Sequence, residues 1–314
     1  MAVHILRRLL QAIPVLLFSS LIVFSILQLV PGDPATNLAG PDASDEDVEI
    51  IRHRLGLDRP VAQQYIEWIG NAVRGDLGDS FRNSRSVSEL LGDALAPTLE
   101  LTLAAFTLEL AFGVVLGVMA GTHLRSGWDW GLSGFTMLGI AIPHFVLGLV
   151  FIYFISFRLE LLPIGGRVSL LDDPVEGLRY LVLPAVVLGL TGAAVLARFV
   201  RTSIAQVMNQ DYIRTARAKG LAGRAVVIRH GLRNGLVPIV TVIALQFAAL
   251  LTGSVVVENV FSRPGIGRLV VGAIQARDYP VVQGALLFLV FGFIMINLLA
   301  DIMYGILDPR IRLG

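Results

Sequence analysis

Residues 9–30 read LLQAIPVLLFSSLIVFSILQLV, a run of 22 residues without a charged side chain. A helix needs about 20 apolar residues to cross the hydrocarbon core of a bilayer, so this run predicts a membrane-spanning helix. Arg7 and Arg8 precede the run, as basic residues also precede a secretory signal. The apolar part of a cleaved signal is shorter, about 7–15 residues, and no small-x-small cleavage motif follows Val30. We therefore expect an uncleaved span.

The whole chain has the composition of a membrane protein. Of its 314 residues, 55% are hydrophobic and only 16% are charged, whereas a soluble domain carries about 25% charged residues. Five further apolar stretches are long enough to span a bilayer, namely residues 98–121, 131–157, 180–197, 236–257 and 281–305. Prolines inside several of these stretches are tolerated in membrane helices. We expect an all-α integral membrane protein with six transmembrane helices.

The distribution of Lys and Arg predicts which side of the membrane each segment occupies. Six spans place both termini on the same side. If the termini are inside, the inner segments hold Arg7, Arg8, Arg125, Arg310, Arg312 and the eight basic residues between positions 198 and 233. Loops rich in Lys and Arg stay in the cytoplasm. Both termini are therefore expected in the cytoplasm.

The segment 31–97, between the first two spans, is too long for a simple connection. We expect it to form a helical extracytoplasmic insertion. Ser44 followed by the acidic stretch 45–49 is typical of a capped helix start. Residues 61–73 have the spacing of an amphipathic helix, with Tyr65 and Trp68 on one face. A folded cap over the spans explains the insertion more simply than a ligand site does.

The outer loop 258–280 contains a turn cluster, Arg263-Pro264-Gly265-Ile266, that is a candidate contact for an external partner. These segments suggest a division of the chain into four parts. They are an N-terminal span (1–30), the insertion (31–97), a transmembrane core with the inner loop 198–233 (98–305), and a C-terminal tail (306–314).

The inner loop 198–233 is basic and rich in helix-forming residues. Residues 211–220, DYIRTARAKG, fit a short helix with an acid at its N-terminus, Lys219 in its last turn and Gly220 as its stop. A second amphipathic segment starts near Val226. A basic surface held against anionic lipid headgroups would explain the charge, but it leaves the glycine break and the second segment unexplained. The pattern favours a helix–turn–helix that docks onto another protein.

Residues 214–221, RTARAKGL, together with RHGLRN at 229–234 and Pro238, resemble the coupling-loop motif of ABC-transporter permeases. The general motif has Glu-Ala-Ala four residues before the glycine, where this chain has Arg214-Thr215-Ala216. That departure resembles the B-type permeases of the dipeptide, oligopeptide and nickel importer branch. Further motifs match the same branch, so that the resemblance runs through nearly the whole chain: Pro31-Gly32-Asp33-Pro34, residues 55–60, Gly75-Asp76-Leu77-Gly78 and Leu307-Asp308-Pro309-Arg310.

The resemblance implies the type I ABC importer permease architecture in a bacterial-type inner (plasma) membrane. Such a subunit forms half of a translocation pathway for dipeptides or oligopeptides. Its implied partners are a second homologous permease in a heterodimer, two cytoplasmic ATPase subunits, an extracytoplasmic substrate-binding protein and membrane lipid, with no nucleic acid. The residues implied in coupling to the ATPase are Tyr212, Arg214, Thr215, Ala216, Arg217, Lys219, Gly220 and Leu221.

No Gly-x-x-x-x-Gly-Lys-Ser/Thr motif for nucleotide binding occurs in the chain. The resemblance therefore places ATP and magnesium on the partner subunits. The absence of cysteine excludes disulfides and Cys-based metal sites. We expect no catalytic residue, no bound cofactor and no metal site in this chain, and hence no enzyme activity of its own.

Polar side chains inside the apolar stretches are candidates for function, because they are costly in a bilayer. The candidates for lining a translocation pathway are Glu109, Gln246, Ser254 and Asn297. Hydrogen bonding between helices is the simpler explanation for the last three, and for Glu109 both roles stay open. Glu100 follows Pro97 closely, so we expect it to stabilise the first turn of its helix.

Other functions fit parts of the sequence. Gly131-Leu132-Ser133-Gly134 matches the Gly-x-Ser-Gly of rhomboid-type intramembrane proteases. A nucleophilic serine needs a base within hydrogen-bond reach, and His144 would lie about 16 Å along the same helix. An ion-gradient-driven secondary transporter is an alternative, but no internal repeat supports it and the basic loop would have no obvious role. A membrane anchor would not require proline-bearing spans together with patterned outer loops.

Overall fold

The computed structural model describes residues 2–29, 33–40, 42–236 and 239–307. Within these ranges the regular structure is helical, apart from an isolated bridge between Asp79 and Ser86. The chain forms two compact units. Unit 1 consists of Met1–Ala96 and Pro264–Met295, and unit 2 of Pro97–Arg263 and Ile296–Gly314. Some motif positions quoted above lie outside the described ranges, namely Pro31, Gly32, Pro238 and residues 308–310.

Five helices in the described part of the chain are long and apolar enough to cross a membrane. They are α1 (Ala2–Gln28), α5 (Val87–Thr122), α8 (Pro174–Met208), α12 (Ile239–Val260) and α14 (Tyr279–Leu307). A bent pair makes a sixth crossing if it counts as one span. This pair is α6 (Gly127–Ala141) and α7 (His144–Phe151), which η1 (Ile152–Arg158), a π-helical stretch, extends. The all-helical membrane fold predicted from the sequence is thus confirmed.

The third predicted span, 131–157, is wrong as a single helix. The chain bends by 102° between α6 and the helix formed by α7 and η1. At the bend, Ile142 and Pro143 are extended, with ψ angles of 118° and 144°. Proline lacks an N–H, and its ring disfavours the helical conformation at the preceding residue. Pro143 therefore ends α6 instead of being accommodated within one long helix.

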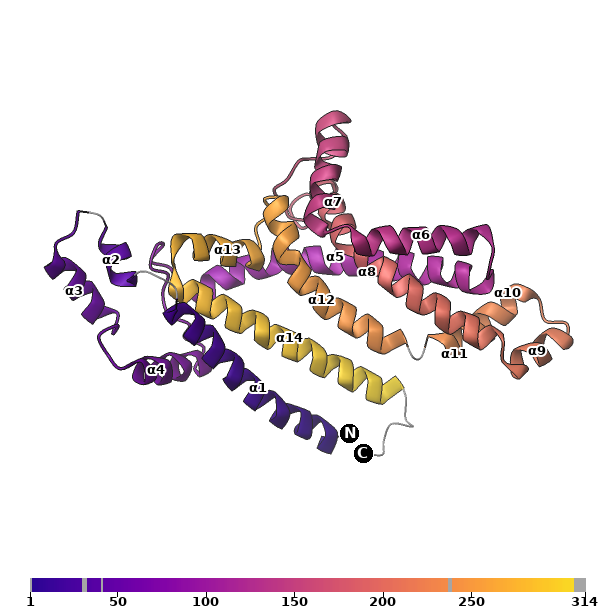
Figure 1. Cartoon of the computed structure of the whole chain (residues 1–314), viewed down its shortest axis with the longest axis horizontal. Helices are drawn as coiled ribbons and strands as arrows, with labels where there is room; N and C mark the ends of the chain where they lie inside the picture. The colour runs from indigo at the N-terminus through magenta and orange to yellow at the C-terminus, as the bar shows by residue number, and fades with distance from the viewer. Residues whose placement is uncertain (1, 30–32, 41, 237–238, 308–314) are drawn as a thin grey trace. The chain divides into compact units, whose positions relative to one another are not determined.

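Unit 1 contains α1, three short helices, the first part of α5, α13 (Ile266–Ala276) and most of α14. The short helices are α2 (Pro34–Ala39), α3 (Asp45–Arg54) and α4 (Val61–Val73). The start of α3 carries a capping box in which Ser44 and Asp47 exchange hydrogen bonds, as the acidic stretch predicted. Helix α4 lies against α1 (Figure 1).

The core of unit 1 forms where the start of α5 packs against α13 and the start of α14. Its buried members include Val87, Leu91, Ile266, Val270 and Ala285. Asp278, between α13 and α14, accepts hydrogen bonds from Ser80 Oγ at 2.5 Å and Phe81 N at 3.1 Å. These bonds hold the segment before α5 against the start of α14.

Helix α5 begins at Val87, eleven residues before the start predicted for the second span. Ser86 precedes it, and its Oγ accepts a hydrogen bond from Glu89 N at 3.2 Å. The apolar residues of the first turns pack into the core of unit 1, which stabilises the helix before the longer apolar run begins. Glu100 therefore lies in the body of α5, and the prediction that it stabilises a first turn is wrong.

In unit 2, α8 is the helix with the most neighbours, and it packs against α6, α7 and α12. Figure 1 shows α6 running beside α8. Three glycines of α5 face α8 at four-residue spacing, namely Gly113, Gly117 and Gly121. A Cβ atom at Gly117 would lie 2.6 Å from Val200 Cβ. Small residues at this spacing allow helix backbones to approach closely, so α5 and α8 form a tight pair.

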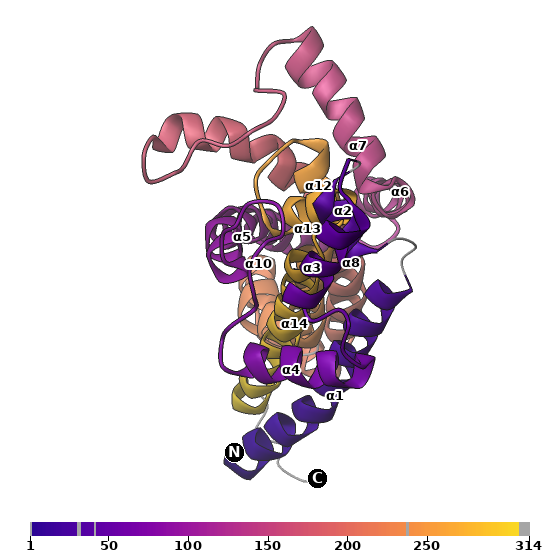
Figure 2. The ribbon, with the colours of Figure 1, turned by 90° about the vertical axis from the view of Figure 1, so that its left-hand side faces the viewer.

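Figure 2 shows the helix of α7 and η1 and the loop that returns from it to the start of α8. This loop, residues 159–173, contacts the end of α12. Gly166 N donates to the Phe261 carbonyl oxygen at 2.8 Å. A Cβ atom at Gly165 would lie 2.2 Å from that same oxygen, so only glycine permits the approach.

At the other end of α8, the helix continues to Met208, and the first eleven residues of the predicted loop 198–233 are helical. The remainder forms α9 (Asp211–Ala218), α10 (Gly223–Ala225), η2 (Val226–Leu232, a π-helical stretch) and α11 (Arg233–Gly235). The predicted helix–turn–helix is confirmed, but it starts directly from the end of a span.

Candidate functional site

Helix α9 and the segment after it form a small hairpin with its own apolar core. Ile213 and Ala216 of α9 are buried against Val226, and Met208 at the end of α8 packs on the same cluster. Gly220 has a φ of +77°, the left-handed conformation that glycine adopts at helix ends. Its N–H donates to the Arg217 carbonyl oxygen at 2.9 Å. The hairpin is therefore fixed to α8 by packing rather than by the loop alone.

The outer side of this hairpin carries most of the predicted coupling residues. We call the exposed set the hairpin surface: Tyr212, Arg214, Thr215, Arg217, Lys219, Gly220 and Leu221. Tyr212 and Leu221 are 42% and 43% exposed, although both are large and apolar in part. Asn234 Nδ2 donates to Tyr212 Oη at 3.2 Å. Ala216, predicted with this set, faces the hairpin core instead, because it shares a helix face with Ile213.

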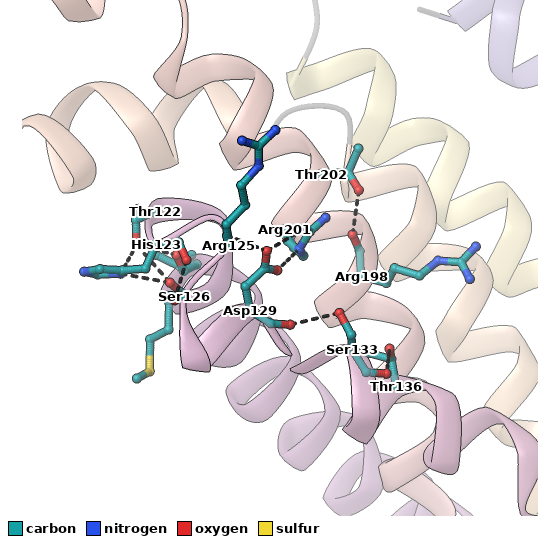
Figure 3. Close-up of polar contacts among 12 residues, drawn as sticks. Thr122, His123, Arg125, Ser126, Asp129, Ser133, Thr136, Arg198, Arg201 and Thr202 are labelled. Atoms are coloured by element: carbon teal, nitrogen blue, oxygen red, sulfur yellow. Dashed lines mark hydrogen bonds and ion pairs between the residues drawn. The ribbon is translucent and has the colours of Figure 1, made fainter. Parts of the chain in front are cut away.

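An ion pair joins α6 to α8 near this end of unit 2 (Figure 3). The Arg201 guanidinium donates to both carboxylate oxygens of Asp129, from Nε to Oδ1 and from Nη2 to Oδ2 at 2.9 Å. Arg125 N also donates to Asp129 Oδ2, at 2.9 Å. No local sequence pattern indicates this pair, because Asp129 and Arg201 are 72 residues apart in the chain. The pair links α6 to the part of α8 that leads into the hairpin.

A second polar site lies between α5, α8 and α12. Glu109 is fully buried, and neither of its carboxyl oxygens has a hydrogen-bond partner among the described residues. Its carboxyl group lies against Gly192, where an added Cβ atom would come within 2.3 Å of Glu109 Oε2. Gln246 Nε2 donates to the Gly192 carbonyl oxygen at 3.2 Å. Two of the predicted pathway residues, Glu109 and Gln246, therefore meet at Gly192.

The other two predicted pathway residues are not part of this middle site. Ser254 is buried, and its Oγ donates to the Leu251 carbonyl oxygen of its own helix at 2.8 Å. Asn297 lies half-buried on α14. Ser133, from the protease-like motif, likewise donates to the Asp129 carbonyl oxygen of its own helix at 2.9 Å.

A third site, which we call the outer charge cluster, surrounds Glu100. Arg167 donates to its carboxylate from Nε at 3.0 Å and from Nη2 at 2.6 Å, and Arg263 Nη2 donates at 2.8 Å. Thr98 Oγ1 donates to Glu258 Oε1 at 2.7 Å in the same region. Hydrogen bonding to Glu100 raises the pKa of the Arg167 guanidinium. Burial lowers the pKa of the Arg263 guanidinium, and the negative charge of Glu100 opposes this shift.

The outer charge cluster changes the interpretation of the turn cluster 263–266. The Arg263 side chain is 1% exposed, and Gly265 and Ile266 are buried as well. Of the four residues predicted to contact an external partner, only Pro264 is exposed. Arg263 is therefore a structural partner of Glu100 and not a free surface arginine. Among the described residues, no group of three or more His, Asp or Glu side chains could hold a metal ion.

Two family models together match most of the chain. Residues 113–313 match the binding-protein-dependent transport system inner membrane component, and residues 1–102 match the N-terminal part of such a membrane component. The chain is 45% identical over 313 residues to a protein of Brucella abortus (strain 2308), and 99% of each chain is covered. That protein is named "putative peptide transport system permease protein".

Glutathione transport system permease protein GsiC of Escherichia coli (strain K12) is 41% identical over 310 residues, with 98% of each chain covered. Among solved structures, the chain resembles an inward-facing conformation of the MetNI methionine ABC transporter, with a TM-score of 0.59 and 18% identity. That match covers 70% of this chain and 96% of the other. At this identity the match shows a shared fold.

Proposed function

The chain belongs to the family of binding-protein-dependent transport system inner membrane components, and from this premise we propose its substrate, orientation and partners. It is a multi-pass inner membrane permease subunit of an ABC importer. Such subunits lack an ATPase domain and carry no cofactor, and ATP is used by the partner ATPases. The alternative of a carrier driven by an ion gradient is therefore not retained.

The proposed substrates are short peptides, including glutathione. Proteins similar to this chain over nearly its whole length are named for peptide and glutathione transport. In the proposed assembly, this chain forms half of the pathway, and a second, homologous permease forms the other half. Two ATPase subunits lie on the cytoplasmic side with both termini, and a substrate-binding protein lies outside. Pro264, the exposed member of the turn cluster, is the residue we retain as a contact for the binding protein.

The hairpin surface is the proposed docking site for an ATPase subunit. The observation that carries this proposal is the buried contact of Ile213 and Ala216 with Val226 and Met208. Because Met208 ends α8, a displacement of the hairpin is transmitted directly to a helix that spans the membrane. The Asp129–Arg201 pair extends the connection to α6. Closure of the ATP-bound ATPases would thus favour one arrangement of these helices over another.

A double substitution of Tyr212→Ala and Leu221→Ala tests this docking site. Both side chains are exposed and lie outside the hairpin core, so the fold should be kept while apolar contact area is lost. Truncating central interface residues costs about 2 kcal/mol or more. We expect ATPase subunits to copurify poorly and ATP-dependent uptake to fall at least tenfold. Arg224→Ala, at an exposed residue of α10, is the matched control.

Unchanged uptake and normal copurification in the double variant would show that the hairpin surface is not the docking site. Uptake by reconstituted vesicles that proceeds on an ion gradient without ATP would contradict the proposed importer as a whole.

The middle site at Glu109, Gln246 and Gly192 is the proposed polar point of the pathway. A carboxyl group that is fully buried without a hydrogen bond is costly in a membrane. It would gain a partner if a relative movement of α5 and α8 admitted a substrate with a cationic amino group. Ser254 and Asn297 stay candidates with lesser support, because Ser254 is bonded within its own helix.

A further inference from the structure

Helix α4 packs against a part of α1 that lies well inside the span. Tyr65 Oη lies 2.9 Å from Ser20 Oγ, and Ser20 is fully buried. The rings of Tyr65 and Trp68 contact Phe24, with ring centroids 5.5 and 5.9 Å apart. The span of α1 covers Arg7–Ile26. Ser20 precedes its outer end by six residues, which corresponds to about 9 Å along the helix axis.

The apolar side chains of α4 form one continuous arc when they are placed at about 100° per residue. Tyr65 and Trp68 occupy one half of the arc and pack on α1. Ile66 and Val73 occupy the adjacent half, and they are 66% and 82% exposed. The half of the apolar arc that α1 does not cover is therefore open.

The polar side of α4 adjoins the exposed apolar half, with Gln63 about 60° and Glu67 about 100° from Ile66 around the helix axis. Gln63 Nε2 donates to Glu67 Oε1 at 2.9 Å, and Arg59 Nη1 donates to Glu67 Oε2 at 2.5 Å. Hydrogen bonding to Gln63 lowers the pKa of the Glu67 carboxyl. Around the axis of α4, the side that packs on α1 is thus followed by an exposed apolar strip and then by a charged strip.

We propose that α4 is an interfacial helix whose apolar strip, at Ile66 and Val73, lies among the acyl chains of the outer leaflet. At the same level of α1, Ile22 and Ile26, on the face turned away from α4, are 45% and 53% exposed, so this level of α1 is already one that faces lipid. Interfacial helices bury their apolar face about 5–10 Å deep, which agrees with the depth of Ser20. Naming the outer leaflet rests on the proposed orientation of the termini.

This proposal differs from the folded aqueous cap that the insertion suggested. Single exposed apolar residues are common on soluble surfaces and would need no explanation. Here they lie on the arc of a helix that is fixed to a transmembrane helix below the outer end of its span. The charged strip would then face the headgroups and water, where the Arg59–Glu67 pair is solvated.

The chain contains no cysteine, so single cysteines can be introduced and spin-labelled without background. The variants are Ile66→Cys and Val73→Cys on the apolar strip, with Gln63→Cys on the polar side as the matched control. The assembled importer is placed in phospholipid nanodiscs, and collisions of each label with oxygen and with a water-soluble nickel chelate are measured. Two strip positions are used so that either one can carry the test.

We expect the ratio of oxygen to nickel accessibility to be about tenfold higher at Ile66 and Val73 than at Gln63, because polar and charged solutes are excluded from hydrocarbon. Nickel accessibility equal to that of Gln63 would overturn the proposal in favour of an aqueous cap. Low accessibility to both reagents would overturn it in favour of a protein partner covering the strip. ATP-dependent uptake, measured on the same variants, tests the proposed function separately.

Discussion

Two acidic residues of the same helix, Glu100 and Glu109, lie in contrasting surroundings. Glu100 accepts three hydrogen bonds from Arg167 and Arg263, at 2.6 to 3.0 Å. Glu109, nine residues further along α5, is fully buried and has no hydrogen-bond partner in the described part of the chain. A position in an apolar helix therefore does not determine the surroundings of an acidic residue, because the partners of Glu100 come from the loop before α8 and the turn after α12.

The outer charge cluster around Glu100 and the middle site at Glu109 should therefore contribute differently to the free energy of unfolding and to transport. Breaking a buried charge pair leaves an uncompensated charge and is strongly destabilising. Replacing an unpaired buried polar group by an apolar one is close to neutral, or favourable. The outer charge cluster should therefore matter most for folding. In the middle site the Glu109 carboxyl makes no charge pair, so its removal should affect the free energy of unfolding less, and the variants below separate a role in transport from one in helix packing.

Arg263→Met should cause the largest loss of stability, because Arg263 is a buried cation hydrogen-bonded to Glu100. Breaking a buried pair costs about 3–5 kcal/mol. Because Arg167 still pairs with Glu100, we expect a loss at the lower end of this range. Methionine fills a similar volume without the charge. Denaturant unfolding of the purified chain in mild detergent measures this loss. Glu109→Leu is the comparison variant, for which we expect a change of about 1 kcal/mol or less. A greater loss in Glu109→Leu than in Arg263→Met would reverse the comparison.

Gly192→Ala should cause an intermediate loss, because its Cβ atom would lie 2.3 Å from Glu109 Oε2. Overpacking of a well-packed interior costs about 1–3 kcal/mol, and because the group met is the end of the Glu109 side chain, we expect a loss near the lower end of this range. Combining it with Glu109→Ala removes the clash, so the double variant should recover most of the loss in the same unfolding measurement. Gly131→Ala on α6, where a Cβ atom has nothing within 4 Å, is the control. Strictly additive losses would show that Glu109 and Gly192 are not in contact.

Glu109→Gln should leave stability nearly unchanged and lower peptide uptake. A loss of about 1.4 kcal/mol in substrate interaction corresponds to a tenfold decrease, and we expect a decrease of that order. Uptake of labelled dipeptide into vesicles containing the full importer measures it. Thr107→Ala, which removes only a side-chain bond within α5, should have no effect. Equal uptake by Glu109→Gln and the unaltered chain would assign Glu109 to helix packing.

Local features were predicted well from the sequence. The capping box at Ser44 and the glycine stop at Gly220 depend on a few neighbouring residues, and both were recognised from their spacing. The start of α5 at Val87 was missed because its first turns are stabilised by α13 and α14, which come much later in the chain. The bend at Pro143 was missed because a proline in a membrane helix can be either tolerated or helix-ending.

The amino-acid sequence by itself determined that the chain is an all-helical membrane protein, and its motifs determined the resemblance to importer permeases. Hydropathy and local motifs are sums over adjacent residues, so they need no knowledge of the fold. Only the tertiary structure decided that Glu100 is paired and Glu109 is not, and that Arg263 and Ala216 face inward. The partners of Glu100 lie 67 and 163 residues away in the chain. Such pairs depend on how distant segments of the chain pack together, and no local sequence pattern indicates that packing.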